Sequence, residues 1–483
     1  MTDNDGTDVR SAFEEAGQGH VFRFWDQLNQ AERERLIHQA TEINMVELKD
    51  AVQQTFPQGE TTTDTFSDIK PAPWVPLPDK RDGDERKWGE ARKLGEELLR
   101  EGKVAAFTVA GGQGTRLGYD GPKGAFPVTP VTKKPLFQVF AEKLKAGEHR
   151  YESPVPIPWV VMTSEANHEQ TKNFFNKNSH FGLEPDSVHF LPQGMLPAVR
   201  QTDEKPGFEI LLEDRGRIAM NPDGHGGCFR VLAKSGAARN MQEKGIEVIT
   251  YFQVDNPLAP FLDPAFLGFH KSKCSEMSSR AAEKLYPGER VGVFCRRKDN
   301  ALSVIEYIDL PEELASRKEN DGTLTFHAGS LGMHAIDPSF AERVGKGEIK
   351  LPTHAAHKKV PTIDEEGTLV FPEEPNGIKL ETFVFDAIPL AQNACVVEVE
   401  RKEAFSPLKN ARGDTDSIGT CRNDQLRQFA RWAKAGGAEL ETDENGDPTI
   451  SFEITPEYAF DKEEFAEKWK AEGEPAIQDK KVF

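Results

Sequence analysis

The sequence predicts an α/β fold in which helices flank a central, mainly parallel sheet. Short apolar runs alternate with helical stretches from about residue 100 to residue 400, the order expected of strands and helices in such a fold. The first apolar run, Val104–Ala110, suits a strand buried on both faces. A glycine-rich loop follows it directly, and open α/β sheets bind their ligands at the carboxyl ends of their strands.

The 483 residues are enough for about two to four domains. We divide them into an N-terminal helical region and linker at 1–98, the α/β domain at 99–400 and a small C-terminal domain at 401–483. Helical periodicity between residues 20 and 55 supports the first region. Threonine, proline and aspartate then dominate from Pro57 to Pro78, a composition typical of an extended linker.

The elements of the α/β domain follow in order. A helix from about Asp84 to Arg100 leads into the first strand, and the next amphipathic run, Leu136 to Leu144, begins only after the glycine-rich loop. Further strand candidates are Trp159–Met162, Val188–Leu191, Val248–Val254, Val291–Cys295, Phe383–Phe385 and Val396–Val399. The C-terminal domain is predicted to hold a helix from Gln425 to Ala435 and a strand-like run from Thr449 to Ile454.

The net charge of -20 argues against nonspecific binding to nucleic acid or to an anionic membrane surface, since both require basic patches. Residues 101–135 are an exception, because they carry five Lys or Arg residues and only two acids. A basic segment in an acidic protein suits an anionic ligand. We expect no nucleic-acid or membrane partner, and a monomer or a weak homo-oligomer.

The five cysteines are odd in number and include no C-x-x-C pair, which is typical of reduced thiols in a cytosolic protein. The first residues have neither a basic start nor an apolar stretch, and no run approaches membrane-spanning length. We therefore expect a cytoplasmic protein.

The loop after the first strand has the composition of a phosphate-binding loop. Glycines at 111, 112 and 114 have no Cβ to block a ligand, so their backbone N–H groups can point at phosphate oxygens. Arg116 adds a planar fork of donors and Lys123 a compact charge. The dinucleotide fingerprint fails because Leu117 stands where a third glycine is required, and the Walker pattern fails because Gly124 follows Lys123. A glycine-rich strand exit that binds nothing is the plain alternative.

Three further positions could carry chemistry. Asp255 follows the strand Val248–Val254, and a carboxylate at that edge can hold Mg²⁺ together with phosphate and water oxygens; a simple Asn-Pro turn is the alternative. The glycine cluster around His225 suggests close approach to a base or sugar, or else a hairpin turn. Glu306 could accept hydrogen bonds from sugar hydroxyls or lie exposed on a strand. The sequence contains no G-x-S-x-G nucleophile motif.

Several motifs in one order resemble the eukaryotic-type UDP-N-acetylhexosamine pyrophosphorylases of the UDP-sugar pyrophosphorylase family, from about residue 20 to residue 440. They are Val109-Ala-Gly-Gly-Gln-Gly-Thr-Arg-Leu-Gly118, Pro122-Lys-Gly124, Gln193-Gly-Met-Leu-Pro197, Pro222-Asp-Gly224, Val254-Asp-Asn256, Asn376-Gly-Ile-Lys-Leu-Glu-Thr-Phe-Val-Phe-Asp386 and Phe405-Ser-Pro-Leu-Lys-Asn410. The resemblance implies a Rossmann-like, glycosyltransferase-A-like nucleotidyltransferase. Such an enzyme joins UTP to a sugar 1-phosphate with Mg²⁺ and releases pyrophosphate.

The resemblance also implies site residues. The catalytic cations are Arg116, Lys123 and Lys409, with Asp255 as the metal ligand. The nucleotide contacts are Ala110, Gly111, Gly112, Gly114, Thr115, Gln193 and Gly224. The sugar contacts are His225, Gly292, Glu306, Ser330 and Phe383.

Two of these positions depart from the family pattern. His225 and Ser330 stand where the family has asparagines expected to touch the sugar. The resemblance makes N-acetylglucosamine 1-phosphate the first candidate acceptor. Because Ser330 is shorter than asparagine, glucose 1-phosphate, galactose 1-phosphate and an altered amino sugar stay open. A non-catalytic UDP-sugar sensor on the same fold is a second alternative. A glycosyltransferase is a weaker one, because Asp255-Asn256-Pro257 lacks the second acid of a D-x-D motif.

Overall fold

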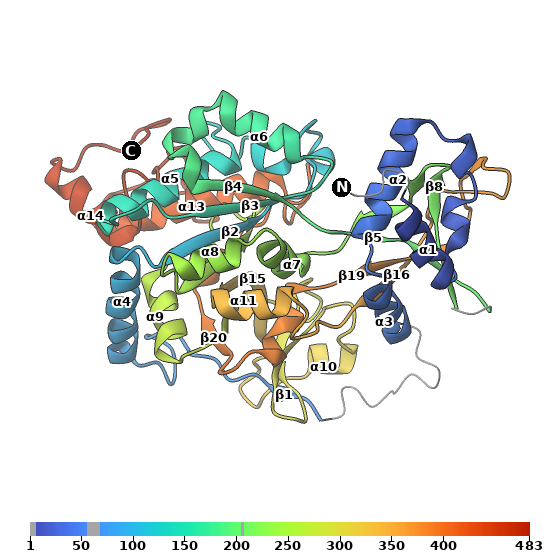
Figure 1. Ribbon diagram of the computed structural model, residues 1–483. Helices are drawn as coiled ribbons and strands as arrows, with labels where there is room; N and C mark the ends of the chain where they lie inside the picture. The colour runs from blue at the N-terminus through green and yellow to red at the C-terminus, as the bar shows by residue number, and fades with distance from the viewer. Residues whose placement is uncertain (1–5, 56–67, 204–206) are drawn as a thin grey trace. The chain divides into compact units, whose positions relative to one another are not determined.

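The computed structural model describes residues 6–55, 68–203 and 207–483 (Figure 1). The chain forms two compact units, each assembled from separate segments. Unit 1 comprises Met1–Ser67, Gln193–Arg230 and Gly347–Asp386, and unit 2 comprises Asp68–Pro192, Val231–Lys346 and Ala387–Phe483. The linear division predicted from the sequence stays a prediction. Residues 57–67 of the predicted linker lie outside the described residues.

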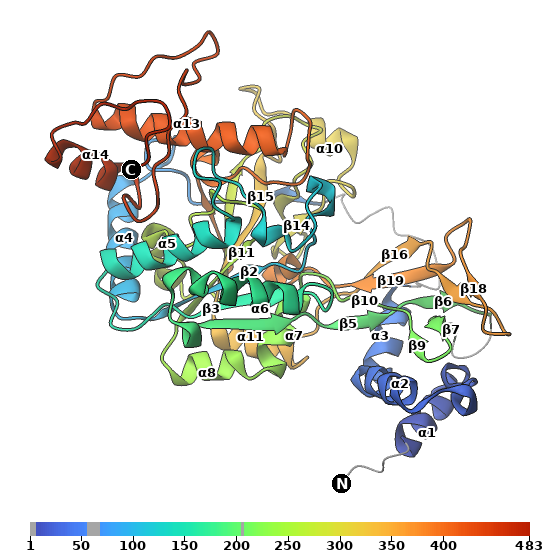
Figure 2. The same ribbon diagram turned by 90° about the horizontal axis from the view of Figure 1, so that it is seen from above.

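Unit 2 contains a ten-stranded mixed sheet with the order β1-β13-β15-β11-β2-β3-β4, from which β12, β14 and β20 branch (Figure 2). The strands are β1 (Lys70–Pro71), β2 (Val104–Val109), β3 (Trp159–Thr163), β4 (Val188–Pro192), β11 (Val248–Gln253), β12 (Met277–Glu283), β13 (Val293–Arg296), β14 (Leu302–Ile305), β15 (Ala328–Ile336) and β20 (Cys395–Glu398). Strands β11, β2, β3 and β4 run parallel, whereas β13 and β15 are antiparallel to their neighbours. The predicted α/β class is confirmed.

Helices cover this sheet. They are α4 (Glu85–Arg100), α5 (Leu136–Arg150), α6 (His168–Lys177), α8 (Ala237–Glu243), α9 (Pro264–Ser272), α10 (Glu312–Ser316), α11 (Pro338–Gly345), α12 (Arg401–Ala404), α13 (Ile418–Gly436) and α14 (Lys462–Ala471), with α7 (Gly227–Lys234) spanning the boundary to unit 1. None of the described helices is long and apolar enough to cross a membrane. Helices α4 and α9 pack with little space between their backbones, since a Cβ on Gly268 would lie 1.7 Å from the Ala91 carbonyl oxygen. Only glycine fits at such a crossing.

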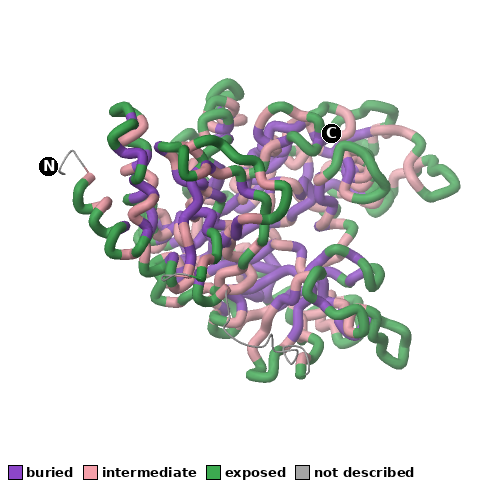
Figure 3. Tube along the Cα trace, turned by 90° about the vertical axis from the view of Figure 1, so that its right-hand side faces the viewer, coloured by how far each residue is buried: buried purple, intermediate pink, exposed green. Residues whose placement is uncertain are grey.

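The core of unit 2 lies between the sheet and these helices, where the strands are buried (Figure 3). Trp159 on β3 is fully buried, and its indole N–H donates to the Thr108 hydroxyl at 2.8 Å. Phe137 on α5 packs edge-on against Trp159. A smaller apolar cluster joins α13 to α14 around Phe465 and Trp469. These contacts hold the carboxyl end of β2 in place.

Unit 1 combines helices with small antiparallel sheets. Its elements are α1 (Thr7–Glu15), α2 (Gln30–Glu42), α3 (Met45–Thr55), the sheet β16 (His354–Lys358), β19 (Gly377–Glu381), β6 (Val199–Gln201), β7 (Phe208–Ile210), and the pairs β5 (Met195–Pro197) with β10 (Met220–Pro222), β8 (Leu212–Asp214) with β9 (Arg217–Ile218) and β17 (Thr362–Ile363) with β18 (Leu369–Val370). Helix α2 begins with a capping box between Asn29 and Glu32. The helices predicted between residues 20 and 55 are confirmed.

Two predicted strands are wrong. Phe383 and its neighbours precede and begin a 3₁₀ helix, η7 (Val384–Leu390), because the Val384 N–H donates to the His225 ring at 3.1 Å and not to a sheet. Residues 449–454 form no strand and make one isolated bridge, between Glu453 and Val482. Here the apolar residues pack onto α13, so burial and not strand pairing explains the pattern.

Candidate functional site

The glycine-rich loop, which we call the phosphate loop (residues 110–124), folds back on itself after β2. The Gly114 N–H donates to the Gly121 carbonyl at 2.8 Å, and the Lys123 N–H donates to the Gly112 carbonyl at 3.0 Å. The Asn167 side-chain amide donates to the carbonyls of Ala110 and Gly112 at 2.9 and 3.3 Å. The carbonyl oxygens of Ala110, Gly112 and Gly121 are thus bonded within the fold.

The loop contains two short 3₁₀ turns, η3 (Thr115–Leu117) and η4 (Lys123–Ala125), and Lys123 is the first residue of the second. A Cβ on Gly112 would lie 3.9 Å from the Lys123 Cε atom. On the other side, a Cβ on Gly124 would lie 2.2 Å from the ring of Phe137, so glycine is required there. Packing of the loop against α5 therefore fixes the backbone that carries Lys123.

Asp255 meets Lys123 because β2 and β11 are parallel neighbours whose carboxyl ends share one edge of the sheet. The Lys123 ammonium Nζ lies 3.5 Å from the Asp255 carboxylate Oδ2, and the two side chains are 17% and 15% exposed. A pair this deep is less screened by solvent than a surface salt bridge. The structure thus brings a cation and a carboxylate together beside glycine backbone.

The segment that carries Lys409 is tied to the same edge. The Leu408 N–H donates to the Asp255 carbonyl at 2.8 Å, and the Asn256 amide donates to the Ala404 carbonyl at 2.8 Å. The Ser406 N–H donates to the Asn256 side-chain oxygen at 3.0 Å. Sequence reasoning missed this role of Asn256, because an asparagine before proline is usually a turn residue.

Arg116 is connected to that segment as well. Its carbonyl accepts the Ala411 N–H at 3.1 Å. Lys409 itself is held by Asp416, whose carbonyl accepts the Lys409 N–H at 2.8 Å and whose carboxylate lies 3.9 Å from the ammonium. The backbones of all three predicted cations, Arg116, Lys123 and Lys409, therefore converge near Asp255.

Asp255 offers a metal one carboxylate. The described residues contain no group of three or more His, Cys, Asp or Glu side chains suited to hold a metal ion. This donor set fits a hard cation that completes its shell with phosphate oxygens and water, as Mg²⁺ does. It does not fit zinc, which takes three or four nitrogen, sulfur or carboxylate ligands from the protein.

Three predicted sugar contacts meet in unit 2, at the ends of strands β13, β14 and β15. A Cβ on Gly292 would lie 3.0 Å from the Glu306 carboxylate, and the Ser330 N–H donates to the Gly292 carbonyl at 2.8 Å. Glycine at 292 therefore leaves room for the carboxylate, and Glu306 and Ser330 border the same short stretch of backbone.

The other predicted contacts belong to unit 1. His225 stacks on Phe383 with ring centroids 5.2 Å apart, and Phe383 stacks on His354 at 4.4 Å. Phe385 completes what we call the aromatic cluster (His225, His354, Phe383 and Phe385). The His354 imidazole lies 2.7 Å from the Asp386 carboxylate. Sequence reasoning missed His354 and Asp386, because no spacing signal joins them to His225.

The protonation of His225 follows from its surroundings. Burial, together with the charge of His354 when it is protonated, lowers the pKa of His225 to about 4. Its Nδ1 atom accepts the Val384 N–H at 3.1 Å, so the neutral ring carries its proton on Nε2. His225 is therefore a hydrogen-bond donor at neutral pH.

The two remaining predicted nucleotide contacts, Gly224 and Gln193, also belong to unit 1. Gly224 has φ of 83°, and its Cβ would lie 2.4 Å from the Thr382 carbonyl oxygen, so only glycine fits. Gln193 stands next to Gly194, whose carbonyl accepts the Asp223 N–H at 3.0 Å. Burial raises the pKa of the Asp223 carboxyl to about 6.

Comparisons with known proteins agree with this geometry. The chain matches the sequence model of the family described as UTP--glucose-1-phosphate uridylyltransferase over residues 51–415. It is 38% identical to "UDP-N-acetylhexosamine pyrophosphorylase-like protein 1" of Xenopus tropicalis, over 91% of this chain and 86% of that protein. It is 34% identical to the UDP-N-acetylglucosamine pyrophosphorylase of Saccharomyces cerevisiae, over 89% of this chain and 92% of that one.

Among solved structures, the chain resembles the UDP-N-acetylglucosamine pyrophosphorylase of Trypanosoma brucei in complex with an inhibitor. The two share 26% identity and a TM-score of 0.82, with 98% of this chain and 96% of that chain covered. The mixed sheet, the phosphate loop and the cations at its edge define a nucleotidyltransferase. The protein belongs to the UTP--glucose-1-phosphate uridylyltransferase family, and its relatives of 33–38% identity are UDP-sugar pyrophosphorylases and pyrophosphorylase-like proteins.

Proposed function

We propose that the protein joins UTP to N-acetylglucosamine 1-phosphate, forming the UDP-sugar and releasing pyrophosphate. The observation that carries this proposal is the convergence of the phosphate loop, the Lys123–Asp255 pair and the Lys409 segment at the carboxyl ends of β2 and β11. Relatives that cover most of the chain are named for this activity.

The triphosphate of UTP would be bound by the phosphate loop, with Arg116 and Lys123 as its cations. The backbone N–H groups of Gly111, Gly112 and Thr115 are the proposed phosphate donors. The N–H groups of Ala110 and Gly114 already donate to the Met162 and Gly121 carbonyls, so these two residues are proposed to line the site with their backbone. Gln193 and Gly224 of unit 1 are the proposed uridine contacts.

The reaction needs no protein nucleophile. A phosphate oxygen of the sugar 1-phosphate attacks the α-phosphorus of UTP in line, and the bond to the pyrophosphate oxygen breaks. The protein positions two anions that repel each other and neutralises the charge that accumulates between them. Arg116, Lys123 and Lys409 supply that positive charge, and Lys409 is the cation assigned to the sugar 1-phosphate.

Enzymes of this family generally require a divalent metal ion, and we propose Mg²⁺ with Asp255 as its protein ligand. When bound, Mg²⁺ polarises phosphoryl oxygens and lowers their negative charge. Asp255 is already held by the Leu408 N–H and paired with Lys123, so its carboxylate is positioned before a metal arrives.

The acceptor sugar is proposed to contact His225, Phe383, Gly292, Glu306 and Ser330. Because Ser330 is shorter than asparagine, glucose 1-phosphate or galactose 1-phosphate is the second candidate acceptor. A cytoplasmic location, and a monomer or weak homo-oligomer without nucleic-acid or membrane partners, also remain proposals.

The experiment is a measurement of pyrophosphate release from UTP and Mg²⁺ with four acceptors at equal concentration: N-acetylglucosamine, N-acetylgalactosamine, glucose and galactose 1-phosphates. We expect pyrophosphate release with at least one acceptor and the highest kcat/KM with N-acetylglucosamine 1-phosphate. No release with any acceptor, together with measurable binding of a UDP-sugar, would identify a sensor and overturn the enzyme proposal.

A further inference from the structure

Unit 2 contains a cavity that is separate from the proposed active site. Its volume is about 800 Å³, which is within the range of small-molecule sites. Its walls come from residues 77–79, helix α4, helix α5, the loop that follows β11, residues 400–403, helix α13 and residues 453–463. None of the residues assigned above to nucleotide, sugar or metal lines it.

The walls of this cavity are largely aromatic and apolar. Trp88, Phe261, Phe429, Trp432 and Phe460 line it from different elements. Both indole N–H groups are already used, since Trp88 donates to the Pro76 carbonyl at 2.8 Å and Trp432 donates to the Glu403 carboxylate at 3.0 Å. The rings therefore offer flat apolar faces, which suit a flat apolar ligand body.

One cation in the cavity has only neutral partners. The Lys143 ammonium donates to the carbonyls of Pro257 and Ala259 at 2.7 and 3.1 Å. Within the described residues Lys143 makes no ion pair, although an ammonium has three donors. Burial lowers the pKa of Lys143 to about 7. An anion that reaches Lys143 would therefore stabilise its charged ammonium form.

Four of the acids that line the cavity have ion-pair or hydrogen-bond partners. Glu142 pairs with Lys134 at 2.8 Å, Glu403 pairs with Arg431, and Asp461 pairs with Arg150 at 3.1 Å. The Glu453 carboxylate accepts the N–H groups of Val131 and Thr132. An entering anion would thus find Lys143 as a donor whose charge is not yet neutralised.

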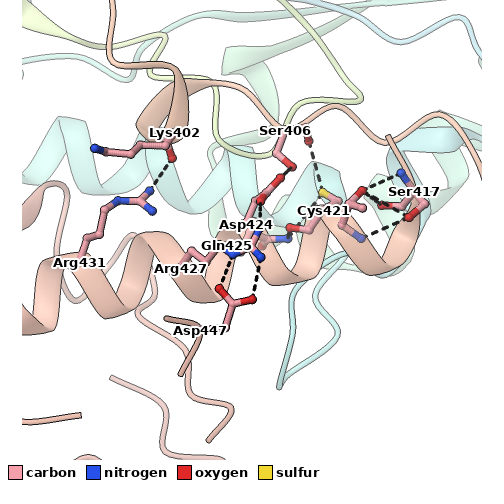
Figure 4. Close-up of polar contacts among 10 residues, drawn as sticks. Lys402, Ser406, Ser417, Cys421, Asp424, Gln425, Arg427, Arg431 and Asp447 are labelled. Atoms are coloured by element: carbon pink, nitrogen blue, oxygen red, sulfur yellow. Dashed lines mark hydrogen bonds and ion pairs between the residues drawn. The ribbon is translucent and has the colours of Figure 1, made fainter. Parts of the chain in front are cut away.

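Two walls of the cavity lead directly to the proposed catalytic edge. The carbonyls that hold Lys143 belong to the loop that continues from Asp255, and the opposite wall at 400–403 continues into the Lys409 segment. Figure 4 shows how α13 is tied to that segment: Arg431 donates to the Lys402 carbonyl at 2.5 Å, and Ser406 donates to Asp424 at 2.8 Å. An anion that bonds to the third donor of Lys143 would shift the ammonium relative to these two carbonyls and so change the position of the loop after Asp255.

We propose that this cavity is an effector site for an aromatic monoanion, a flat apolar ring system that carries one carboxylate or sulfonate group. The ring lies between the aromatic walls, and the anion takes the third donor of Lys143. Binding lowers the kcat of uridylyl transfer and leaves the KM for UTP unchanged, because the ligand acts on the loop and does not occupy the nucleotide site. The effect on kcat rests on the proposed function, whereas the binding does not.

The test uses 8-anilinonaphthalene-1-sulfonate as the anionic probe and N-phenyl-1-naphthylamine as its neutral counterpart, titrated by fluorescence into the full chain. We expect saturable binding of one anionic probe per chain that saturating UTP does not displace. Lys143→Met should weaken the binding of the anionic probe by about tenfold or more, as expected for a lost hydrogen bond to a charged group. The same substitution should leave the neutral probe unchanged.

Lys145→Met is the matched control, because Lys145 lies on the same helix, pairs with Glu457 and does not line the cavity. Ala435→Trp is a second variant that places a large ring at the exposed rim without removing the lysine. Ala435→Trp should weaken the binding of both probes. If Lys143→Met does not fold, this variant alone tests whether the probes bind in the cavity. Unchanged affinity of the anionic probe in either folded variant, or displacement of the probe by UTP, would overturn the site.

Activity separates the two proposals. With saturating anionic probe, kcat should fall at least twofold in the wild type and stay unchanged in Lys143→Met. Binding without any change in kcat overturns the effector role. A protein that binds the probe as described but releases no pyrophosphate under any condition contradicts the proposed function and leaves the binding result standing.

Discussion

In the phosphate loop of unit 2, the backbone hydrogen bonds that close the loop join residues near one another in the sequence, Gly112 with Lys123 and Gly114 with Gly121. The Asn167 side chain adds bonds to the carbonyls of Ala110 and Gly112 from further along the chain. In the aromatic cluster of unit 1, His225 meets Val384, which is 159 residues away. The loop is rigid because glycine allows a tight backbone path, whereas the cluster is rigid because rings stack and one backbone N–H fixes a tautomer. The shape of the phosphate loop is thus specified mainly by local sequence, whereas the aromatic cluster is specified by tertiary packing.

The strongest test of the phosphate loop is the substitution Lys123→Ala. Removing the cation nearest Asp255 should lower pyrophosphate release by about 100-fold or more, because charge stabilisation dominates phosphoryl transfer. Circular dichroism should show a folded protein. Lys103→Ala is the matched control, since Lys103 precedes β2 at its opposite end and pairs with Glu101 and Glu247. Near-normal turnover of Lys123→Ala removes this residue from the mechanism.

Asp255→Asn tests the metal ligand. The Mg²⁺ concentration needed for half-maximal turnover should rise by about tenfold or more, because a neutral amide binds Mg²⁺ more weakly than a carboxylate. The measurement is a Mg²⁺ titration of pyrophosphate release, with Asp186→Asn, an exposed position before β4, as the control. A lower kcat with an unchanged Mg²⁺ dependence would assign Asp255 to positioning alone.

The sugar end is probed by restoring the family's side chain with Ser330→Asn. An asparagine can reach a sugar substituent that serine cannot, so kcat/KM for N-acetylglucosamine 1-phosphate relative to glucose 1-phosphate should rise by up to about tenfold. The KM for UTP should stay constant. If the preference between the two sugars does not change, Ser330 does not determine specificity.

The last prediction concerns the stability of the aromatic cluster and not turnover. Burial lowers the pKa of His225 to about 4, against about 6.5 in an unfolded chain, so between these values the unfolded state binds the extra proton. Stability contributed by this site therefore rises as pH increases from 4 to 6.5 and is constant above. His225→Asn removes the group, so relative to wild type it should be more stable at pH 4.5 than at pH 7.5, by about 2.5 kcal/mol.

Urea unfolding at the two pH values measures this difference. His38→Asn, at an exposed position on α2 of the same unit, is the control. A difference between His225→Asn and wild type that is the same at both pH values would show that His225 is not held neutral by its surroundings.

The same contrast explains what the sequence could predict. The composition of Val104–Val109 and of the glycines after it predicted a buried strand followed by a tight loop, and the expected parallel sheet placed Asp255 at the carboxyl edge where the structure has it. The pairing of β12 with β15, the turn of η7 and the contact of His354 with Asp386 depend on partners far along the chain. No local pattern of residues specifies such partners, so they became visible only in three dimensions.

The hydrogen bonds of Asn256 can form only after a much later part of the chain has been synthesised. Its side chain bonds to Ala404 and Ser406, which are 148 and 150 residues further along, and the Asp255 carbonyl bonds to Leu408. A nascent chain that has emerged only to residue 400 already contains the phosphate loop and Asp255 but lacks every one of these bonds. During synthesis the loop after β11 therefore acquires its final support only when the last fifth of the protein leaves the ribosome.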